Sequence, residues 1–249
     1  MIELTEKEKK ARERVCLALD VSTVREGLEM ARELSDYVGT VKLNSLFTAA
    51  MDEGTNIIEA IHDEEGSVFL DLKYHDTPNT VRNYGRAAAV PGVYMFNVHI
   101  AGGEEMCRKA IEGAYEGAQA RGIERPKVIG VTVLTSLSDE DLAAQGLGID
   151  YDDLVKRRTE LAKEWGLDGV VCPASKAGAL EQMGYDFIKV TPGIKWAGVQ
   201  REGQKQLYTP DMAVNDCKNS ILVIGGALTK AKDRRGTAYD ILRAMGENL

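Results

Sequence analysis

Short hydrophobic runs alternate with longer segments of helical periodicity along the whole chain. Several runs are apolar almost throughout, such as Val-Cys-Leu-Ala-Leu from position 15 and Ile-Leu-Val-Ile from position 221. This composition is typical of parallel strands that are covered on both faces. The pattern predicts eight such strands: Val15–Asp20, Thr40–Asn44, Ser67–Leu72, Gly92–His99, Lys127–Leu134, Gly169–Cys172, Phe187–Thr191 and Ile221–Gly225.

The segments between these runs place apolar residues at the spacing of an amphipathic helix. At Thr77-Pro78, a hydroxyl residue followed by proline marks a helix start. The predicted helices are Thr23–Tyr37, Leu46–Glu65, Thr77–Val90, Glu104–Arg121, Asp152–Trp165, Ser175–Met183, Pro210–Asp216 and Gly236–Met245.

The repetition of strand and helix predicts the architecture. Eight such units in 249 residues match the usual size of a (β/α)8 TIM barrel of the α/β class. No Pro/Ser-rich linker divides the chain, so we expect a single domain over residues 1–249, with Glu3–Arg14 as a short extra N-terminal helix. An open doubly wound sheet is the alternative. That fold typically has a glycine-rich turn after its first strand, and residues 18–22 contain no glycine.

Composition and charge restrict the classes of function. The chain is 44% hydrophobic and 28% charged, as an ordinary globular protein is. Its formal net charge of -8 gives no global positive field for nucleic acid, although a small anion needs only a local positive site. No signal peptide is recognisable, and no apolar run approaches the roughly 18 residues of a membrane span. We therefore expect a cytoplasmic protein that binds neither nucleic acid nor membrane.

Cysteine and histidine spacing gives no sign of a metal site. Cys16, Cys107, Cys172 and Cys217 include no Cys-x-x-Cys pair and predict buried thiols. His75 and His99 have no His or Cys partner at ligand spacing. We expect neither a metal nor a cofactor.

Charged residues end three neighbouring strands of the predicted barrel. Asp71 and Lys73 are two apart, so they share a face on an extended backbone, and Asp76 lies in the turn beyond. Lys42 ends the second strand and Asp20 ends the first. Catalytic groups of such barrels come from the C-terminal ends of strands, so these alternating charges predict a catalytic site. A buried ion-pair network that fixes the strand ends is the structural alternative.

These residues resemble the signature of the orotidine 5'-phosphate decarboxylase family. The resemblance continues, in the order and spacing of the bacterial members, through Asn97-Val-His99-Ile-Ala-Gly-Gly, Val131-Thr-Val-Leu-Thr135-Ser136, Leu167-Asp-Gly-Val-Val-Cys172, Val190-Thr-Pro192-Gly193-Ile and Gly203-Gln204. A lone Asp-x-Lys is weak evidence, whereas this ordered set is strong. It implies decarboxylation of orotidine 5'-phosphate to uridine 5'-phosphate in pyrimidine biosynthesis, without metal or cofactor, through a carbanion-like transition state at C6.

The resemblance also implies a role for each charged residue. Lys73 stands at the proton-donor position near C6, and Asp71 and Asp76 keep it charged. Asp71 would also lie against the substrate carboxylate, so that repulsion falls as carbon dioxide leaves. The Asp76 and Thr80 positions serve the active site of the other subunit, which implies a homodimer with shared sites.

Substrate binding is implied for a wider set of positions. Lys42 and Asp20 would hold the ribose hydroxyls, Thr135 or Ser136 would meet the pyrimidine edge, and Gln204 would close over phosphate and base. Glycines after strands seven and eight suit phosphate because they let backbone N–H groups approach an anion. The whole set is Asp20, Lys42, Thr80, Thr135, Ser136, Pro192, Gly193, Lys195, Gln204, Gly225 and Gly226.

The end of strand eight departs from the family pattern. Family members have Gly-Arg there, and the arginine holds phosphate as a bidentate fork, whereas this chain has Gly225-Gly226. Lys195 also stands where the bacterial pattern has arginine. Losing the fork weakens phosphate binding by a few kcal/mol. Three explanations stay open: compensation by Lys195, Arg201 or Lys230, a substitution introduced to probe the phosphate site, or a natural relative with a changed ligand.

Two rival functions also stay open. A magnesium-dependent sugar-phosphate decarboxylase or aldolase of the same superfamily has a similar Asp-x-Lys-x-x-Asp array. The continuation from His75 to Thr80 and the position of Lys42 resemble the pyrimidine enzyme instead. The second rival is a noncatalytic nucleotide-binding relative, which would have no need of a proton-donating lysine between carboxylates.

Overall fold

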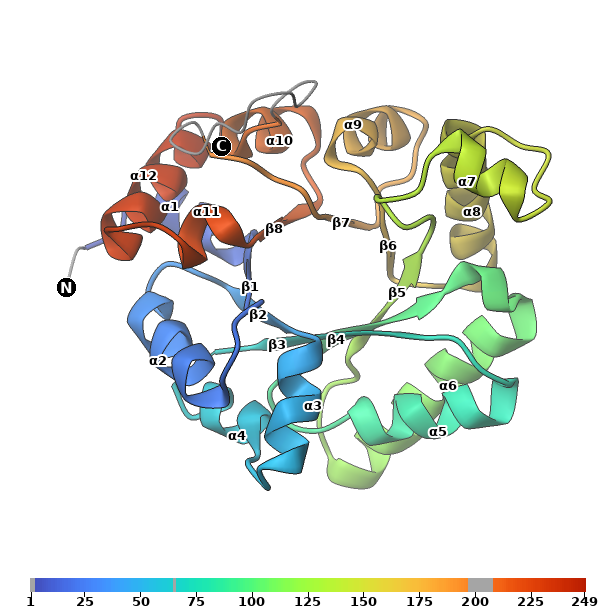
Figure 1. The fold of residues 1–249 in the computed structure, drawn as a ribbon, viewed down its shortest axis with the longest axis horizontal. Helices are drawn as coiled ribbons and strands as arrows, with labels where there is room; N and C mark the ends of the chain where they lie inside the picture. The colour runs from blue at the N-terminus through green and yellow to red at the C-terminus, as the bar shows by residue number, and fades with distance from the viewer. Residues whose placement is uncertain (1–2, 65, 197–207) are drawn as a thin grey trace. The chain divides into compact units, whose positions relative to one another are not determined.

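Parallel strands form the centre of the fold. The computed structural model describes residues 3–64, 66–196 and 208–249. Within these ranges eight strands close into a parallel barrel in sequence order (Figure 1). They are β1 (Val15–Ala18), β2 (Thr40–Leu43), β3 (Val68–Tyr74), β4 (Val93–His99), β5 (Lys127–Val131), β6 (Gly169–Val171), β7 (Ile188–Thr191) and β8 (Ser220–Ile224). The (β/α)8 architecture predicted from the sequence is therefore confirmed.

Helices alternate with the strands. They are α1 (Glu6–Glu13), α2 (Val24–Leu34), α3 (Ser45–Asp52), α4 (Ile57–His62), α5 (Pro78–Ala88), η1 (Ile100–Gly102), α6 (Glu104–Arg121), α7 (Asp139–Ala144), α8 (Tyr151–Trp165), α9 (Ala174–Gln182), α10 (Pro210–Asp216), α11 (Gly226–Thr229) and α12 (Arg234–Gly246). The N-terminal helix expected over Glu3–Arg14 is α1. It begins with a capping box between Thr5 and Glu8 and packs against α12.

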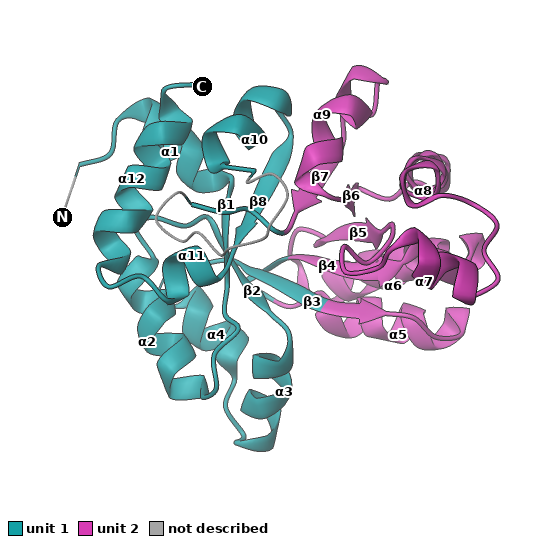
Figure 2. Ribbon diagram, turned by 45° about the horizontal axis from the view of Figure 1, so that its top comes forward, with its two compact units in different colours: residues 1–71, 91–94, 193–249 teal, residues 72–90, 95–192 magenta. Residues whose placement is uncertain are grey.

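Two compact units make up the described chain, and Figure 2 colours them separately. The first consists of Met1–Asp71, Pro91–Tyr94 and Gly193–Leu249, and the second of Leu72–Val90 and Met95–Pro192. In the first unit β1 pairs with both β2 and β8, and β2 pairs with β3. In the second unit β5 pairs with β4 and β6, and β6 pairs with β7.

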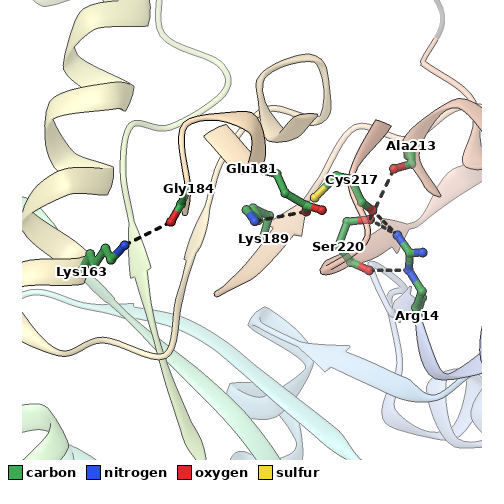
Figure 3. Close-up of polar contacts among 8 residues, drawn as sticks. All are labelled: Arg14, Lys163, Glu181, Gly184, Lys189, Ala213, Cys217 and Ser220. Atoms are coloured by element: carbon green, nitrogen blue, oxygen red, sulfur yellow. Dashed lines mark hydrogen bonds and ion pairs between the residues drawn. The ribbon is translucent and has the colours of Figure 1, made fainter. Parts of the chain in front are cut away.

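Burial of the strands explains their apolar sequences. Every residue of β1 and β8 is buried, as expected of parallel strands with both faces covered. Arg14 precedes β1 and ties it to the start of β8, because its guanidinium donates to the carbonyls of Cys217 and Ser220, at 2.5 and 3.0 Å (Figure 3). In the second unit the fully buried ammonium of Lys189 on β7 lies 3.2 Å from Oε2 of Glu181 on α9 (Figure 3).

Helices α5 and α6 pack against each other at backbone contact distance. A Cβ added at Gly113 of α6 would overlap the carbonyl of Arg82 on α5, and one at Gly117 would overlap that of Arg86. Gly85 of α5 likewise faces the backbone of α6. The small residues therefore let the two helix axes approach more closely than side chains would allow.

The helix predicted over Leu46–Glu65 is wrong, because this segment forms two helices. Helix α3 ends at Asp52, and Gly54 then adopts a φ of 67°, a left-handed conformation that glycine accepts at little cost. Asn56 starts α4 as its N-cap, since its side chain accepts from the backbone N–H of Glu59 at 3.3 Å.

Other elements also depart from the sequence prediction: β3 continues to Tyr74 rather than ending at Leu72, and the short helix α11 (Gly226–Thr229) was not predicted. Strand β5 ends at Val131 rather than at Leu134. Beyond it lies α7, which the periodicity did not predict. A capping box between Ser138 and Asp141 starts this helix, and the Ser-x-x-Asp spacing is the signal that could have located it.

Candidate active site

In the first unit, three charged side chains from β2, β3 and the residues after β1 lie together. Nζ of Lys42 on β2 lies 3.2 Å from Oδ2 of Asp71 on β3 and 3.6 Å from Oδ1 of Asp20, which follows β1. The side chain of Lys42 is 8% exposed and that of Asp71 is 11% exposed. A buried ammonium is costly unless carboxylates compensate it, and here two do. The predicted grouping of Asp20, Lys42 and Asp71 is therefore found in the structure.

Asn44, Gly225 and Cys16 surround this charged group. Asn44, which follows β2, donates from Nδ2 to Oδ1 of Asp20 at 2.9 Å. Gly225, which follows β8, leaves room beside Asp20, because a Cβ added there would lie 3.8 Å from Oδ2 of that residue. Burial raises the pKa of the Cys16 thiol on β1 to about 12, and of the nearby charges Lys42 lowers this pKa and Asp71 raises it.

In the second unit, Lys73 has an unusual backbone. Its φ is 49°, in the left-handed region, and among the described residues no other non-glycine residue has a positive φ. Such a conformation costs an L-residue about 1 kcal/mol or more. The backbone N–H of Lys73 donates to Oδ1 of Asn97 on β4 at 2.7 Å. Lys73 is nevertheless part of strand β3, which spans Val68–Tyr74.

Asp76 and Thr80 lie at the start of α5. Oδ1 of Asp76 accepts from the N–H of Thr77, the N-cap residue, at 2.6 Å, and Pro78 takes the first helical position as predicted. The hydroxyl oxygens of Thr77 and Thr80 are 3.0 Å apart. Asp76 is exposed and Thr80 is half-buried in this single chain.

The remaining candidates of the second unit lie in loops after strands. Thr135 and Ser136 are exposed and occupy a turn closed by the N–H of Leu137 and the carbonyl of Leu134, at 3.0 Å. Pro192 follows β7 directly and is half-buried. Each of these residues is thus at the C-terminal side of a strand, where barrel enzymes carry their binding groups.

The loop after Pro192 belongs to the first unit. Gly193 has a φ of 87°, a conformation that favours glycine. The N–H of Lys195 donates to the carbonyl of Tyr208 at 3.0 Å. Gln204 and Arg201 lie outside the described residues.

Space is open at the end of β8, where the family pattern has arginine. A Cβ added at Gly226 would lie 3.8 Å from Cδ and 4.0 Å from Cε of Lys230, which is ordinary van der Waals contact. Lys230 lies one helical turn later, and its N–H donates to the carbonyl of Gly226 at 3.2 Å. The alkyl part of Lys230 therefore runs beside the position that a side chain at Gly226 would occupy.

The described ranges show neither a metal-binding cluster nor a membrane-spanning helix. They contain no group of three or more His, Cys, Asp or Glu side chains placed to hold a metal ion. The rings of His75 and His99 lie 5.4 Å apart. None of the helices in these ranges is both long enough and apolar enough to cross a membrane.

Comparison with known proteins identifies the family. The model of the "Orotidine 5'-phosphate decarboxylase / HUMPS family" matches residues 13–241. The chain belongs to this family. Among its similar members, the orotidine 5'-phosphate decarboxylase of Syntrophomonas wolfei is 38% identical over 241 residues, which cover 95% of this chain and 99% of the relative. That of Nitratidesulfovibrio vulgaris is 40% identical over 248 residues, covering 93% and 96%.

A solved member of the family has the same fold. The crystal structure of orotidine 5'-phosphate decarboxylase from Lactobacillus acidophilus superposes with a TM-score of 0.76 at 32% identity, and covers 93% of this chain and 98% of its own. The family resemblance seen in the sequence motifs is therefore confirmed over nearly the whole chain.

Proposed function

We propose that this chain is a carboxy-lyase that converts orotidine 5'-phosphate to uridine 5'-phosphate in pyrimidine biosynthesis, without metal or cofactor. Full-length similarity to proteins of that name supports the substrate. The observation that carries the chemistry is the buried ammonium of Lys42 on β2, which lies between the carboxylates of Asp20 and Asp71. Lys73 follows Asp71 by two residues on β3. A binding protein has no need of such an array, whereas a reaction that develops negative charge does.

Lys73 is the proposed proton donor. The bond between C6 and the carboxylate breaks, its electron pair stays on C6, and carbon dioxide leaves. The ammonium of Lys73 stabilises the developing charge and then delivers its proton to C6. The products are uridine 5'-phosphate and a neutral lysine, which regains its proton from water.

Asp71 and Lys42 prepare the substrate for this step. A carboxylate at position 71 repels the substrate carboxylate in the ground state, and the repulsion falls as carbon dioxide departs. Lys42 and Asp20 hydrogen-bond the ribose hydroxyls, and Thr135 or Ser136 meets the pyrimidine edge. These contacts fix the position of C6 relative to the proton donor.

Binding energy from the phosphate supports the chemical step. Each tenfold in rate requires about 1.4 kcal/mol, so a difficult decarboxylation cannot depend on one lysine alone. Backbone N–H groups near Pro192, Gly193, Gly225 and Gly226 are the proposed phosphate cradle, closed by Gln204. Lys195 and Lys230 supply positive charge in place of the arginine that the family pattern has after strand eight.

We propose further that the enzyme is a cytoplasmic homodimer. Asp76 and Thr80 reach the substrate of the partner subunit. The exposure of Asp76 in the single chain supports this role, since a carboxylate that serves another subunit must be accessible before assembly. Sedimentation velocity of the purified protein measures the oligomeric state.

Loss of orotidine 5'-phosphate absorbance with the purified protein tests the function. We expect the protein to turn over orotidine 5'-phosphate at a rate that a chelator does not reduce. Lys73→Ala should lower this rate by more than about 1,000-fold while the fold stays intact. Activity that a chelator abolishes would favour the magnesium-dependent sugar-phosphate rival. Tight binding of uridine 5'-phosphate with no turnover would favour the noncatalytic relative.

A further inference from the structure

The left-handed backbone of Lys73 requires a cause within the fold. Lysine has no intrinsic preference for a φ of 49°, and strained residues persist only where their surroundings enforce the conformation. Such residues cluster at functional sites, where the strain places a side chain that a regular strand would direct elsewhere. Side chains alternate between the two faces of a regular strand, and the positive φ of Lys73 departs from the backbone that gives this alternation.

Asn97 on β4 accepts a hydrogen bond from this backbone. Its side chain is fully buried, and its Oδ1 accepts the N–H of Lys73 at 2.7 Å. A backbone N–H can only donate, so the carboxamide must present its oxygen there. Asn97 itself lies within β4, in register with Ile129 of β5, between the buried Phe96 and Val98. The Asn97 carboxamide that accepts this hydrogen bond is therefore carried by a buried strand paired with β5, which is more rigid than a loop.

We propose that Asn97 is a positioning residue for Lys73: its carboxamide oxygen holds the Lys73 backbone in the left-handed conformation and so sets where the lysine ammonium lies. The inference rests on the proposed function only where it concerns catalysis. The hold on the Lys73 backbone does not depend on any substrate, so the stability of the chain tests it separately.

Thermal unfolding tests the hold without any substrate. Glycine adopts a left-handed φ more readily than alanine does, but in a regular strand glycine is less stable than alanine. We expect Lys73→Gly to unfold about 2 to 4 °C above Lys73→Ala. At Tyr94, an exposed position within β4, we expect the glycine variant to unfold below the alanine variant. The advantage of glycine at position 73 should shrink when Asn97→Leu removes the acceptor.

Steady-state kinetics test the positioning. Misplacing a reacting group by about 1 Å costs roughly 100-fold in rate, so Asn97→Leu should lower kcat by about that factor while KM stays within about threefold. Asn97→Ser, whose hydroxyl ends short of the Lys73 N–H, is the second variant should the leucine fail to fold. Thr159→Val is the matched control, because Thr159 is also fully buried and its hydroxyl donates to a backbone carbonyl, that of Val155, at 2.8 Å. It should lower the melting temperature and leave kcat unchanged.

The positioning by Asn97, the hold on the backbone and the proposed function can each fail separately. If both Asn97 variants fold and keep kcat within about threefold of the parent, or lose activity through KM alone, Asn97 does not position Lys73. If glycine at position 73 is less stable than alanine, as at Tyr94, the proposed hold is absent. If the Lys73 variants unfold in the expected order but the parent chain does not decarboxylate orotidine 5'-phosphate, the proposed function is wrong and the proposed hold on the Lys73 backbone is not affected.

Discussion

Lys42 and Asp71 form an ion pair that solvent hardly reaches. Nζ of Lys42 lies 3.2 Å from Oδ2 of Asp71, and the two side chains are 8% and 11% exposed. The other carboxylate on Lys42, that of Asp20, is 58% exposed. Water therefore screens the attraction between Lys42 and Asp20, whereas the Lys42–Asp71 ion pair is largely shielded from water.

Removing Lys42 should destabilise the chain. Lys42→Met removes the buried ammonium that lies between Asp20 and Asp71, and we expect the free energy of unfolding to fall by about 3 kcal/mol, measured by urea denaturation. Lys9→Met is the control, because Lys9 forms an ion pair with Glu6 at the surface, where both side chains are exposed. An equal effect of the two substitutions would show that the Lys42 pair contributes no more than a surface pair.

Restoring the family arginine at Gly226 should improve substrate use. The space beside Gly226 is open, and we expect Gly226→Arg to raise kcat/KM for orotidine 5'-phosphate about 10- to 100-fold, mainly through KM. Gly226→Gln controls for the added side chain without its charge. No gain from arginine would mean that another cation, such as Lys230, already fills the role, and Lys230→Ala in the parent would then raise KM.

Buried thiols should make stability fall at alkaline pH. Burial raises the pKa of Cys16 and that of Cys107 from 9.0 to about 12 in each case. The unfolded chain loses these protons first, so their contribution to stability is fully present below pH 9 and is lost as the pH rises towards 12. We expect iodoacetamide at pH 8 to spare both residues in the folded protein and to alkylate them in urea, as mapped by mass spectrometry. Rapid alkylation of folded Cys16 would contradict this.

A methyl group at Gly193 should strain the proposed phosphate loop. Gly193 has a φ of 87° and nothing within 4 Å of an added Cβ, so Gly193→Ala tests the backbone conformation alone. We expect a loss of about 1 kcal/mol in the free energy of unfolding and a higher KM. Gly148→Ala is the matched control, since its Cβ would also meet open space but its φ is not positive. Equal stabilities of the two variants would argue against the strain.

Much of the fold follows from the sequence, because parallel strands covered on both faces must be apolar throughout. The runs at Val15 and Ile221 therefore located β1 and β8 to within a residue or two at each end. The sequence prediction missed the break at Gly54 because the flanking segments keep the same helical periodicity. It is the left-handed glycine and the Asn56 cap that separate α3 from α4.

The charged group at the strand ends was also predictable, since strand order in a parallel barrel places Asp20, Lys42 and Asp71 on adjacent strands. The backbone of Lys73 was not. A left-handed lysine has no signal in its own sequence, and its hydrogen-bond partner, Asn97, is 24 residues away. The local preference of lysine for a negative φ is overridden by a hydrogen bond to Asn97 that forms only in the folded chain.

The glycines between α5 and α6 have a consequence at a distance. Gly113 and Gly117 meet α5 along its side, and the first turns of that same helix carry Thr80, just after Asp76. A single methyl group at Gly113 would press on the carbonyl of Arg82 and shift α5 as a rigid rod, taking Thr80 with it. Glycines on α6, a helix that carries none of the proposed reacting groups, therefore set where Thr80 on α5 lies.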